Sequence, residues 1–446
     1  MRVKEVSGAS WLWIVLLLGL SLRLFGLMEP LIDKQAWRQT DTAAIARNYY
    51  EEGYTLFHPR VDWRGTSSGF VESNFPLYPF VVGLLYSVVG GAYEWVGRLV
   101  AALCSTAAGA LLYLLALRLG LSARSALFGS LFYLLFPLSV YYGRTFMPEA
   151  LMIFLSVAAL WAFARWIDTG TRWDFVLAVW LAALCFLVKI PTLYLGFPLV
   201  ALAWERWGGR FVLKPSLWLY FIAAVLPTVF WYWHASLLFE DTGLTFGIWN
   251  RYGYDKWDRS ILFGLDFYQT MLVRFWHSIY TPIGALLVLL GLSLPPSQRR
   301  EWVLWVWLGG LLCYVFLVPE GNRKLHYYQL PFVPVGALLA GRAVAALLEV
   351  GGAQRGWSRI ARNWTPLQRV VLVGILVVGS AVYGGWAIGP YYDQPNNLHK
   401  YYESCYFAGG IVDDKLPREA KLVIGDLDEN AGAPHRAQSP TLLYYC

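Results

Sequence analysis

Acidic and basic side chains stand close together near the N-terminus, in residues 33–48. Asp33 and Asp41 flank a segment that carries Arg38. A positioned carboxylate can remove the proton of a hydroxyl group, which is otherwise a weak nucleophile near neutral pH. A local role is the alternative, because Thr40 or Asp41 could cap a helix that begins there. We therefore expect either a catalytic carboxylate, Asp41 or else Asp33, or a helix cap.

A second acidic segment, residues 141–149, lies in a connection of only a few residues between two apolar runs. Arg144 and Glu149 must therefore lie at the mouth of the helical bundle. Pro148 suits the first position of a helix. Glu149 then falls in the first turn, where the helix dipole favours a carboxylate. The segment predicts a second catalytic carboxylate or an ordinary helix end.

Two further segments carry groups that could bind a substrate. Glu72 and Asn74 directly precede an apolar run, residues 75–89. Residues 319–331 form a cationic rim with hydrogen-bonding side chains, which are Arg323, Lys324, His326 and Tyr327. Arginine binds phosphate through two parallel hydrogen bonds and lysine binds it as a point charge. The second segment therefore indicates recognition of an anion, with an ordinary positive flank as the alternative.

Lys189 stands at the end of another apolar run and could reach the same anion. Its alternative interpretation is a long side chain that extends from the membrane to water.

The composition shows which elements must position these groups. The chain has 446 residues, of which 57% are hydrophobic and 15% are charged. Soluble proteins contain about 45–50% apolar and about 25% charged residues. The composition therefore excludes a soluble enzyme, a disordered chain and a disulfide-rich secreted domain. It predicts an all-α polytopic membrane protein.

Eleven apolar runs are candidate membrane spans, each of roughly 20 residues or somewhat fewer. They are residues 11–28, 97–117, 125–142, 148–166, 174–190, 191–204, 216–233, 280–294, 302–318, 331–348 and 368–388. The net charge of +7 arises from basic residues in short loops, a pattern that fixes membrane orientation and does not indicate nucleic-acid binding. This pattern of loop charges places the N-terminus in the cytoplasm. Residues 75–89 are interpreted as an interfacial helix, because a full crossing would turn the basic loops outward.

This topology divides the chain into a transmembrane domain, residues 1–388, and a small periplasmic C-terminal domain, residues 389–446. Two large outer loops belong to the first domain, residues 29–96 and 234–279. Strand-like runs at 421–426 and 442–445 predict that the C-terminal domain is α/β. The sequence stops within the second run, as a truncated chain would.

Cysteines and histidines give little indication of a metal. Cys405 and Cys446 could form a disulfide in an oxidising compartment. His234 and His277 flank the second outer loop and could approach each other, but no HExxH or CxxC motif is present. No cofactor is required by the sequence, and a divalent metal stays open.

Five motifs together resemble the membrane-embedded GT-C glycosyltransferases. They are residues 37–47 (WRQTDTAAIAR), 59–63 (PRVDW), 72–78 (ESNFPLY), 143–149 (GRTFMPE) and 326–331 (HYYQLP). The similarity is to the branch of protein O-mannosyltransferases and the lipid A aminoarabinose transferase, known as glycosyltransferase family 39. It extends over roughly residues 10–350.

The resemblance implies transfer of a hexosyl or pentosyl group from a polyprenyl-phosphate donor to a lipid, glycan or protein acceptor at the outer face of the membrane. It also implies that an acidic residue of the first outer loop acts at the acceptor, and Asp41 lies nearest to that place. Arg38 and Gln39 occupy the position of an Asp-Glu pair in relatives. Glu149 falls where relatives carry a second acid. Glu72 and Asn74 fall where the aminoarabinose enzyme has a Glu-Lys pair.

Two other classes of function stay open, a flippase or transporter for lipid-linked sugars and a scaffold without activity. Transporters place ionisable groups near the membrane midplane and often contain inverted repeats. Here the polar groups gather at one face and no repeat is evident, which favours an enzyme. The expected location is the bacterial inner membrane, with membrane lipids around the spans and the C-terminus in the periplasm.

Overall fold

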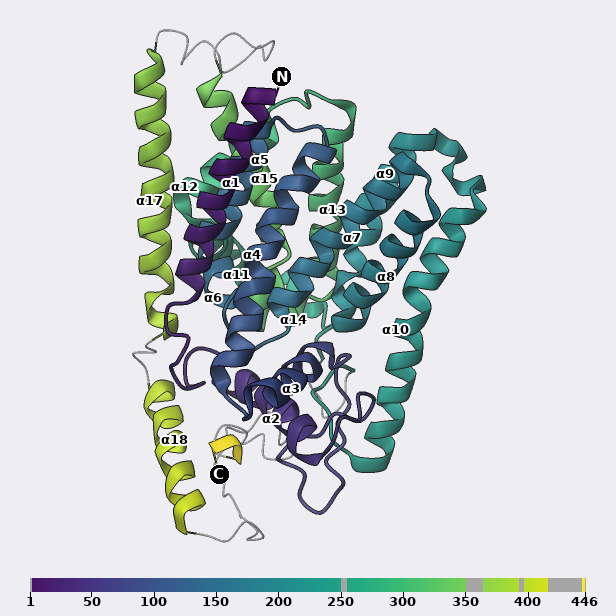
Figure 1. Ribbon diagram of the computed structural model, residues 1–446, viewed down its shortest axis with the longest axis vertical. Coiled ribbons are helices and arrows are strands. Elements are labelled where there is room, and N and C mark those ends of the chain that lie inside the picture. The colour runs from purple at the N-terminus through teal and green to yellow at the C-terminus, as the bar shows by residue number, and fades with distance from the viewer. Residues whose placement is uncertain (1, 250–254, 350–363, 393–396, 416–442, 446) are drawn as a thin grey trace.

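The computed structural model describes residues 2–249, 255–349, 364–392, 397–415 and 443–445. In these ranges the chain is helical, and most of its long helices run side by side along the long axis of the molecule (Figure 1). The long helices are α1 (Arg2–Arg23), α4 (Glu94–Arg118), α5 (Ala123–Leu135), α7 (Glu149–Thr169), α8 (Arg172–Val188), α9 (Gly196–Trp207), α10 (Pro215–Thr242), α12 (Thr281–Ser293), α13 (Val303–Leu317), α15 (Phe332–Leu348) and α17 (Pro366–Tyr392).

Shorter elements connect these helices. They are α2 (Ala36–Glu52), α3 (Leu77–Val89), α6 (Pro137–Tyr142), α11 (Leu265–Val273), α14 (Pro319–Lys324), α18 (Asn397–Lys415), the 3-10 helices η1 (Ile190–Leu195), η2 (Gly208–Leu213), η3 (Ser260–Phe263), η5 (Arg299–Trp302) and η6 (His326–Gln329), and the π-helix η4 (Arg274–Ile279). Each of the eleven predicted spans overlaps one of the long helices.

Five helices in the described residues are long and apolar enough to cross a membrane: α4, α7, α10, α17 and the segment Arg299–Leu317. A sixth candidate is the pair Leu265–Ile279 and Thr281–Ser293, which is bent by 102°. Further apolar helices, among them α5 and α15, are shorter than 18 residues. The chain is thus a multi-pass membrane protein, and the number of eleven spans stays a prediction.

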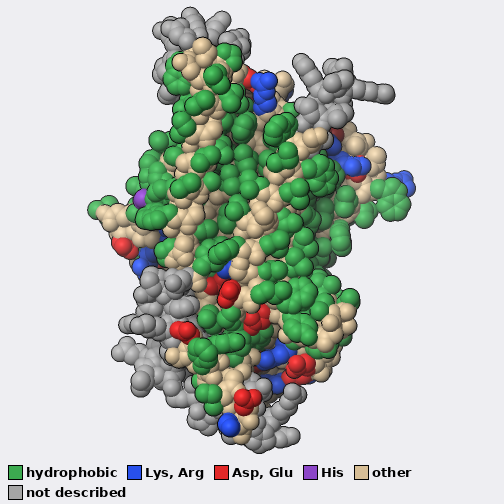
Figure 2. Space-filling view, turned by 60° about the vertical axis from the view of Figure 1, so that its left-hand side comes forward, with side chains coloured by type: hydrophobic (Ala, Val, Ile, Leu, Met, Phe, Trp, Pro, Cys, Tyr) green, Lys and Arg blue, Asp and Glu red, His purple; other side chains and the backbone are tan. Residues whose placement is uncertain are grey.

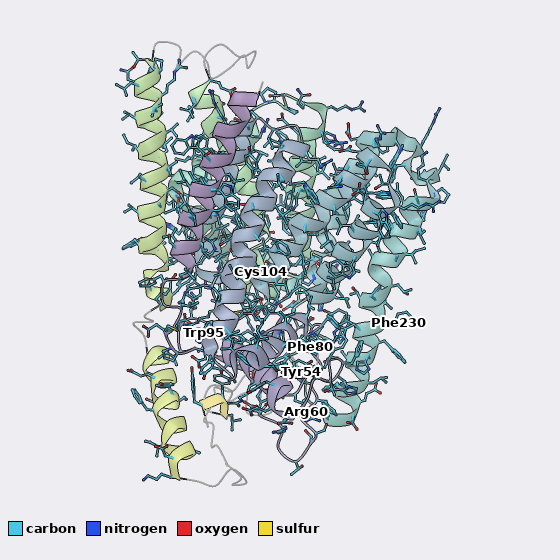
Figure 3. The ribbon with its side chains drawn as sticks, in the orientation of Figure 1. Tyr54, Arg60, Phe80, Trp95, Cys104 and Phe230 are labelled. Atoms are coloured by element: carbon cyan, nitrogen blue, oxygen red, sulfur yellow. The ribbon has the colours of Figure 1, made fainter. Side chains whose placement is uncertain are left out.

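The outer surface of the bundle carries the apolar side chains that contact with lipid requires. Hydrophobic side chains cover the middle of one face, whereas charged side chains gather toward its two ends (Figure 2). On another side, Phe230 of α10 points away from the bundle and is 58% exposed (Figure 3).

One end of the bundle, here called the loop end, carries residues 24–76, 243–249, 255–265 and 319–331. The helices α2 and α3 lie together there, below the ends of the long helices (Figure 1). Tyr54, which follows α2, contacts Phe80 of α3 with ring centroids 6.2 Å apart (Figure 3). The helix α3 is therefore not a member of the bundle, as the interfacial interpretation expected.

Ion pairs fasten the opposite end of the bundle, where the sequence places basic loops. Arg300 bonds Asp168 at 2.8 Å and Glu205 at 3.0 Å, and Arg118 bonds Asp168 at 2.9 Å. These pairs join the ends of α4, α7 and α9 with η5.

The C-terminal region differs from its prediction. Residues 443–445 form a helical turn, not a strand, and α18 is helical, so the described part of the region contains no β-structure. The turn is held by Arg47, whose Nη1 donates to the Tyr444 carbonyl at 2.7 Å. The predicted strand at 421–426 and Cys446 lie outside the described residues, and Cys405 is buried.

The helices α5 and α15 pack so closely that only glycine fits between them. A β-carbon at Gly341 would lie 2.4 Å from the Ser125 carbonyl oxygen and 2.5 Å from the backbone nitrogen of Gly129. Both neighbours are backbone atoms, which cannot rotate away.

We therefore expect Gly341→Ala to lower the unfolding temperature in detergent, since overpacking costs about 1–3 kcal/mol. The matched control is Gly374→Ala in α17, where nothing lies within 4 Å of the added β-carbon. Differential scanning fluorimetry of both variants checks the expectation, and equal unfolding temperatures would contradict it.

Candidate functional site

Asp33 fastens the first loop to the bundle. Its buried carboxylate lies 2.5 Å from Nη2 of Arg144 and 3.5 Å from Nη2 of Arg98. It also accepts a hydrogen bond from Gln39. Arg98 is fully buried and donates a further bond to the Gly26 carbonyl at 2.7 Å. Because this carboxylate is committed to two guanidinium groups and an amide, it is the weaker candidate for a base.

Gln39 carries this anchorage into α2. Its Oε1 accepts a hydrogen bond from the backbone nitrogen of Phe146 at 3.0 Å, so the first turn of α2 docks on the segment before α7. The predicted helix cap is wrong, because α2 begins at Ala36 and both Thr40 and Asp41 lie within it. A residue inside a helix has no free N–H groups to cap.

Asp41 is a buried carboxylate with one oxygen left over. It is 1% exposed, and its Oδ1 accepts a hydrogen bond from the indole nitrogen of Trp63 at 2.8 Å. Its Oδ2 has no hydrogen-bond partner among the described residues. Burial raises the pKa of Asp41 to about 7, although Trp63 and the charge of Arg38 act to lower the pKa. A carboxylate that titrates near neutral pH, with an oxygen free to accept a proton, is suited to general-base chemistry.

Glu149 begins α7, as predicted, and forms a buried ion pair. Its Oε1 lies 2.7 Å from Nζ of Lys189, and its Oε2 has no hydrogen-bond partner within the described chain. Lys189 thus bonds a carboxylate, and its ammonium also lies 5.4 Å from the ring centroid of Tyr327. Arg38 interacts electrostatically with both Asp41 and Lys189. The two carboxylates, distant in sequence, therefore belong to one site at the loop end.

Three nitrogen-bearing side chains from separate elements of the loop end act electrostatically on one another. They are Lys34 of the first loop, Arg274 of η4 and His326 of η6. Burial and the charge of Arg274 lower the pKa of Lys34 to about 8. Burial, with the charges of Lys34 and Arg274, lowers the pKa of His326 to about 3. The three groups disfavour one another's protonation, so a bound anion would relieve their repulsion.

No ion pair compensates Lys34 or Arg274 within the part of the chain that the structure describes. Nζ of Lys34 lies 3.7 Å from the ring centroid of Tyr391. Arg274 donates to the carbonyl oxygens of Asn322 and Arg323, both at 2.6 Å. Carbonyl oxygens orient a guanidinium without neutralising it. Sequence reasoning missed Lys34 and Arg274, and only the proximity of Lys34 to Asp33 could have drawn attention to it.

The predicted cationic rim is largely compensated by carboxylates. Arg323 lies 2.7 Å from Glu320 and 3.6 Å from Asp266, and Lys324 lies 3.1 Å from Glu320. Of the predicted rim, His326 belongs to the group described above. Tyr327 contacts Tyr142, with ring centroids 5.8 Å apart.

Glu72 and Asn74 join the first loop to the segment that follows α10. Glu72 is fully buried and its carboxylate accepts a hydrogen bond from the Thr245 hydroxyl. Glu72 and Thr245 also form an isolated parallel bridge. Asn74 accepts a hydrogen bond from the Tyr232 hydroxyl at 2.9 Å. Glu72 and Asn74 therefore fasten the first loop to α10 and to the segment that follows it.

The histidine prediction is not met. His277 hydrogen-bonds Tyr383, and His234 instead contacts His58, with ring centroids 5.4 Å apart. In the described ranges, no three His, Cys, Asp or Glu side chains are grouped to hold a metal ion.

The anchorage of Asp33 leads to a stability prediction. We expect Asp33→Asn to lower the unfolding temperature strongly, because removing one partner of a buried ion pair costs about 3–5 kcal/mol. Asp41→Asn should leave the unfolding temperature equal or higher, because no cation loses an ion-pair partner. Scanning fluorimetry of the two purified variants distinguishes the roles, and a larger loss for Asp41→Asn would reverse them.

Comparisons with known proteins agree with this architecture. Residues 73–233 match the family of dolichyl-phosphate-mannose-protein mannosyltransferases. The fold is similar to the crystal structure of ArnT from Cupriavidus metallidurans bound to undecaprenyl phosphate. The TM-score is 0.66 at 16% identity, over 98% of this chain and 84% of that one. The apo state of ArnT gives a TM-score of 0.64, also at 16% identity, with the same shares of each chain covered.

A second similar structure is the oligosaccharyltransferase AglB from Archaeoglobus fulgidus in complex with an inhibitory peptide and a dolichol-phosphate. Its TM-score is 0.59 at 13% identity, over 94% of this chain and 59% of that one. No curated protein sequence matches the chain. The family match over residues 73–233 and the fold agree with the resemblance read from the sequence: this is a membrane protein whose fold is similar to that of the glycosyltransferase ArnT.

Proposed function

We propose that the protein transfers a sugar from a polyprenyl-phosphate donor to a hydroxyl group of an acceptor, with Asp41 as the base. The observation that carries the proposal is that the loop end holds two groups that lack a partner of opposite charge or a hydrogen-bond partner. One is the carboxylate oxygen Oδ2 of Asp41, which has no partner in the described residues. The other is the group of Lys34, Arg274 and the neutral His326, whose two cations have no carboxylate partner in the described chain.

The cationic group is suited to the phosphate of the donor. When the bond between sugar and phosphate breaks, negative charge develops on the leaving phosphate, and fixed cations stabilise that charge. Lys34, whose pKa is about 8, is mostly protonated at neutral pH, and a bound anion would raise that pKa again. The similar structures of ArnT and AglB contain undecaprenyl phosphate and dolichol-phosphate. These ligands support the same donor class for this chain.

The reaction then follows from the arrangement. The acceptor hydroxyl gives its proton to Oδ2 of Asp41, and its oxygen forms a bond to the anomeric carbon of the sugar. The bond from that carbon to the phosphate oxygen breaks, and polyprenyl phosphate leaves with the electron pair. The buried site excludes water, which would otherwise compete with the acceptor.

Other residues would position the substrates. Oε2 of Glu149 is buried and lacks a partner in the described chain, so it can accept a hydrogen bond from a sugar hydroxyl. Arg144 acts through Asp33, and Lys189 acts through Glu149. Arg323 and Lys324 line the entrance as a charge-compensated pair of side chains.

We place the loop end at the outer face of a bacterial inner membrane, with the N-terminus in the cytoplasm. The basic residues Arg118, Arg300 and Arg342 support this orientation, because positive loops stay on the cytoplasmic side. A transporter is less consistent with the structure, since the chemistry-bearing groups gather at one end of the bundle and not at its middle.

We predict that Asp41→Asn abolishes transfer, with a loss of about 100-fold or more because general-base catalysis contributes about 10²–10⁴-fold. The assay follows labelled sugar from polyprenyl-phosphate donors into product in membranes that express each variant. Arg64→Gln is the control, because Arg64 pairs with Glu52 at the surface of the same end. Full activity of Asp41→Asn would move the role of base elsewhere.

A second prediction concerns the pH dependence of transfer. Asp41 is protonated, and therefore inactive as a base, below its pKa of about 7, so kcat/KM should rise with pH through that value. Trp63→Phe removes the indole donor that lowers the pKa of Asp41. The acidic limb of the kcat/KM profile should therefore move to higher pH in this variant. A limb that stays in place would show that Asp41 does not set it.

A further inference from the structure

Arg38 is a buried cation that the protein leaves incomplete. The side chain belongs to a residue that is only 9% exposed. Its guanidinium donates no hydrogen bond to any described residue and lies within 4.0 Å of no described carboxylate oxygen. Burying a charge without hydrogen-bonding partners costs free energy, so such a group is expected to meet its partner in a ligand.

The guanidinium rests on an aromatic surface. Its central carbon lies 4.6 Å from the ring centroid of Phe246. Phe246 in turn contacts the ring of Trp63, with centroids 5.7 Å apart. A stacked guanidinium keeps the N–H groups of its edge available for a planar or tetrahedral oxyanion.

Phe246 is held in place by the first loop. The backbone nitrogen of Glu72 donates to the Leu244 carbonyl at 3.0 Å, and the backbone nitrogen of Phe246 donates to the Glu72 carbonyl at 3.0 Å. The Thr245 side chain bonds the Glu72 carboxylate. The seat of Arg38 is therefore built by backbone pairing between two distant segments.

Arg38 lies on the base side of the site. It is three residues before Asp41 in α2, a spacing that puts both side chains on one face of the helix. Its electrostatic partners are Asp41 and Lys189. The cations that act on Lys34 and His326 are members of their own group, and Arg38 is not among them. The guanidinium of Arg38 rests on Phe246, whereas the ammonium of Lys34 rests on Tyr391, so the two cations occupy different aromatic surfaces.

We propose that Arg38 binds an anionic group of the acceptor, a carboxylate or a phosphate, next to the hydroxyl that Asp41 deprotonates. The inference rests on the proposed transfer and adds the acceptor class, an acidic glycan or an anionic lipid head group. Lys189, the other cation on this side, is neutralised by Glu149 and cannot replace it. The guanidinium also offsets the repulsion that an acceptor anion would meet from Asp41.

The test measures ligand binding at two places, the donor place and the acceptor place, on the purified full-length chain in detergent. Undecaprenyl phosphate probes the donor place. Glucuronate and inorganic phosphate probe the acceptor place by ligand-observed NMR, and glucose is the neutral control. Each titration is run on wild type, Arg38→Gln, Arg38→Lys, Arg274→Gln and the surface control Arg64→Gln.

We expect wild type to bind glucuronate or phosphate, but not glucose, even when it is saturated with undecaprenyl phosphate. Arg38→Gln should weaken the bound anion about tenfold or more, since a hydrogen bond to a charged group contributes at least that much. Arg38→Lys, which keeps the charge and loses the fork, should weaken it less and reports on the site if Arg38→Gln does not fold. Arg274→Gln should weaken undecaprenyl phosphate alone.

Three outcomes would overturn the inference. The first is an anion affinity that is unchanged in both Arg38 variants. The second is the loss of all anion binding once undecaprenyl phosphate is bound. The third is that Arg38→Gln weakens undecaprenyl phosphate as much as Arg274→Gln does. If wild type failed to bind undecaprenyl phosphate at all, the proposed function itself would be contradicted.

Discussion

The site depends on one buried cluster of charges, the carboxylate of Asp33 between the guanidinium groups of Arg98 and Arg144. Arg98 belongs to α4 and Arg144 to the segment before α7, so the cluster fixes the first loop on two helices. A pair of this kind is neutral or unfavourable as a source of stability, but it is specific, because removing any member leaves a buried charge. Lys34 follows Asp33 directly, and Gln39 transmits the anchorage to α2. Every group that we assign to chemistry on the first loop inherits its place from this cluster.

The same low-dielectric surroundings have a second effect on the side chains that are not paired. Asp41 lacks a cation within ion-pair distance in the described chain, so burial moves its pKa to about 7 and not below its usual range. Burial and mutual repulsion lower the pKa values of Lys34 and His326. Paired charges thus build the frame, while unpaired charges are poised to exchange protons or bind anions. This division explains how one end of a bundle can hold nine ionisable groups in distinct roles: Asp33, Lys34, Arg38, Asp41, Arg98, Arg144, Glu149, Lys189 and Arg274.

The sequence predicts the helices better than the site. Apolar runs locate the long helices because lipid demands apolar side chains and internal hydrogen bonds. The interfacial position that the loop charges favour for α3 stays a prediction. Glu149 is foreseen at a helix start because Pro148 marks it. The sequence does not decide whether Asp33 or Asp41 is the base, because the decision depends on the ion pair between Asp33 and Arg98, which lies 65 residues further on. Arg274 is invisible for the same reason, since the π-helix η4 and the carbonyl oxygens of α14 aim it at the site.

The central claim is that two cationic places and one unpaired carboxylate surround the reacting bond. A cryo-EM structure of the full chain with undecaprenyl phosphate tests it most directly. The account predicts the phosphate within hydrogen-bond distance of Lys34 and Arg274, with the space between it and Asp41 open for the sugar and acceptor. A phosphate bound at Arg323 and Lys324, or separated from Asp41 by packed side chains, would contradict it.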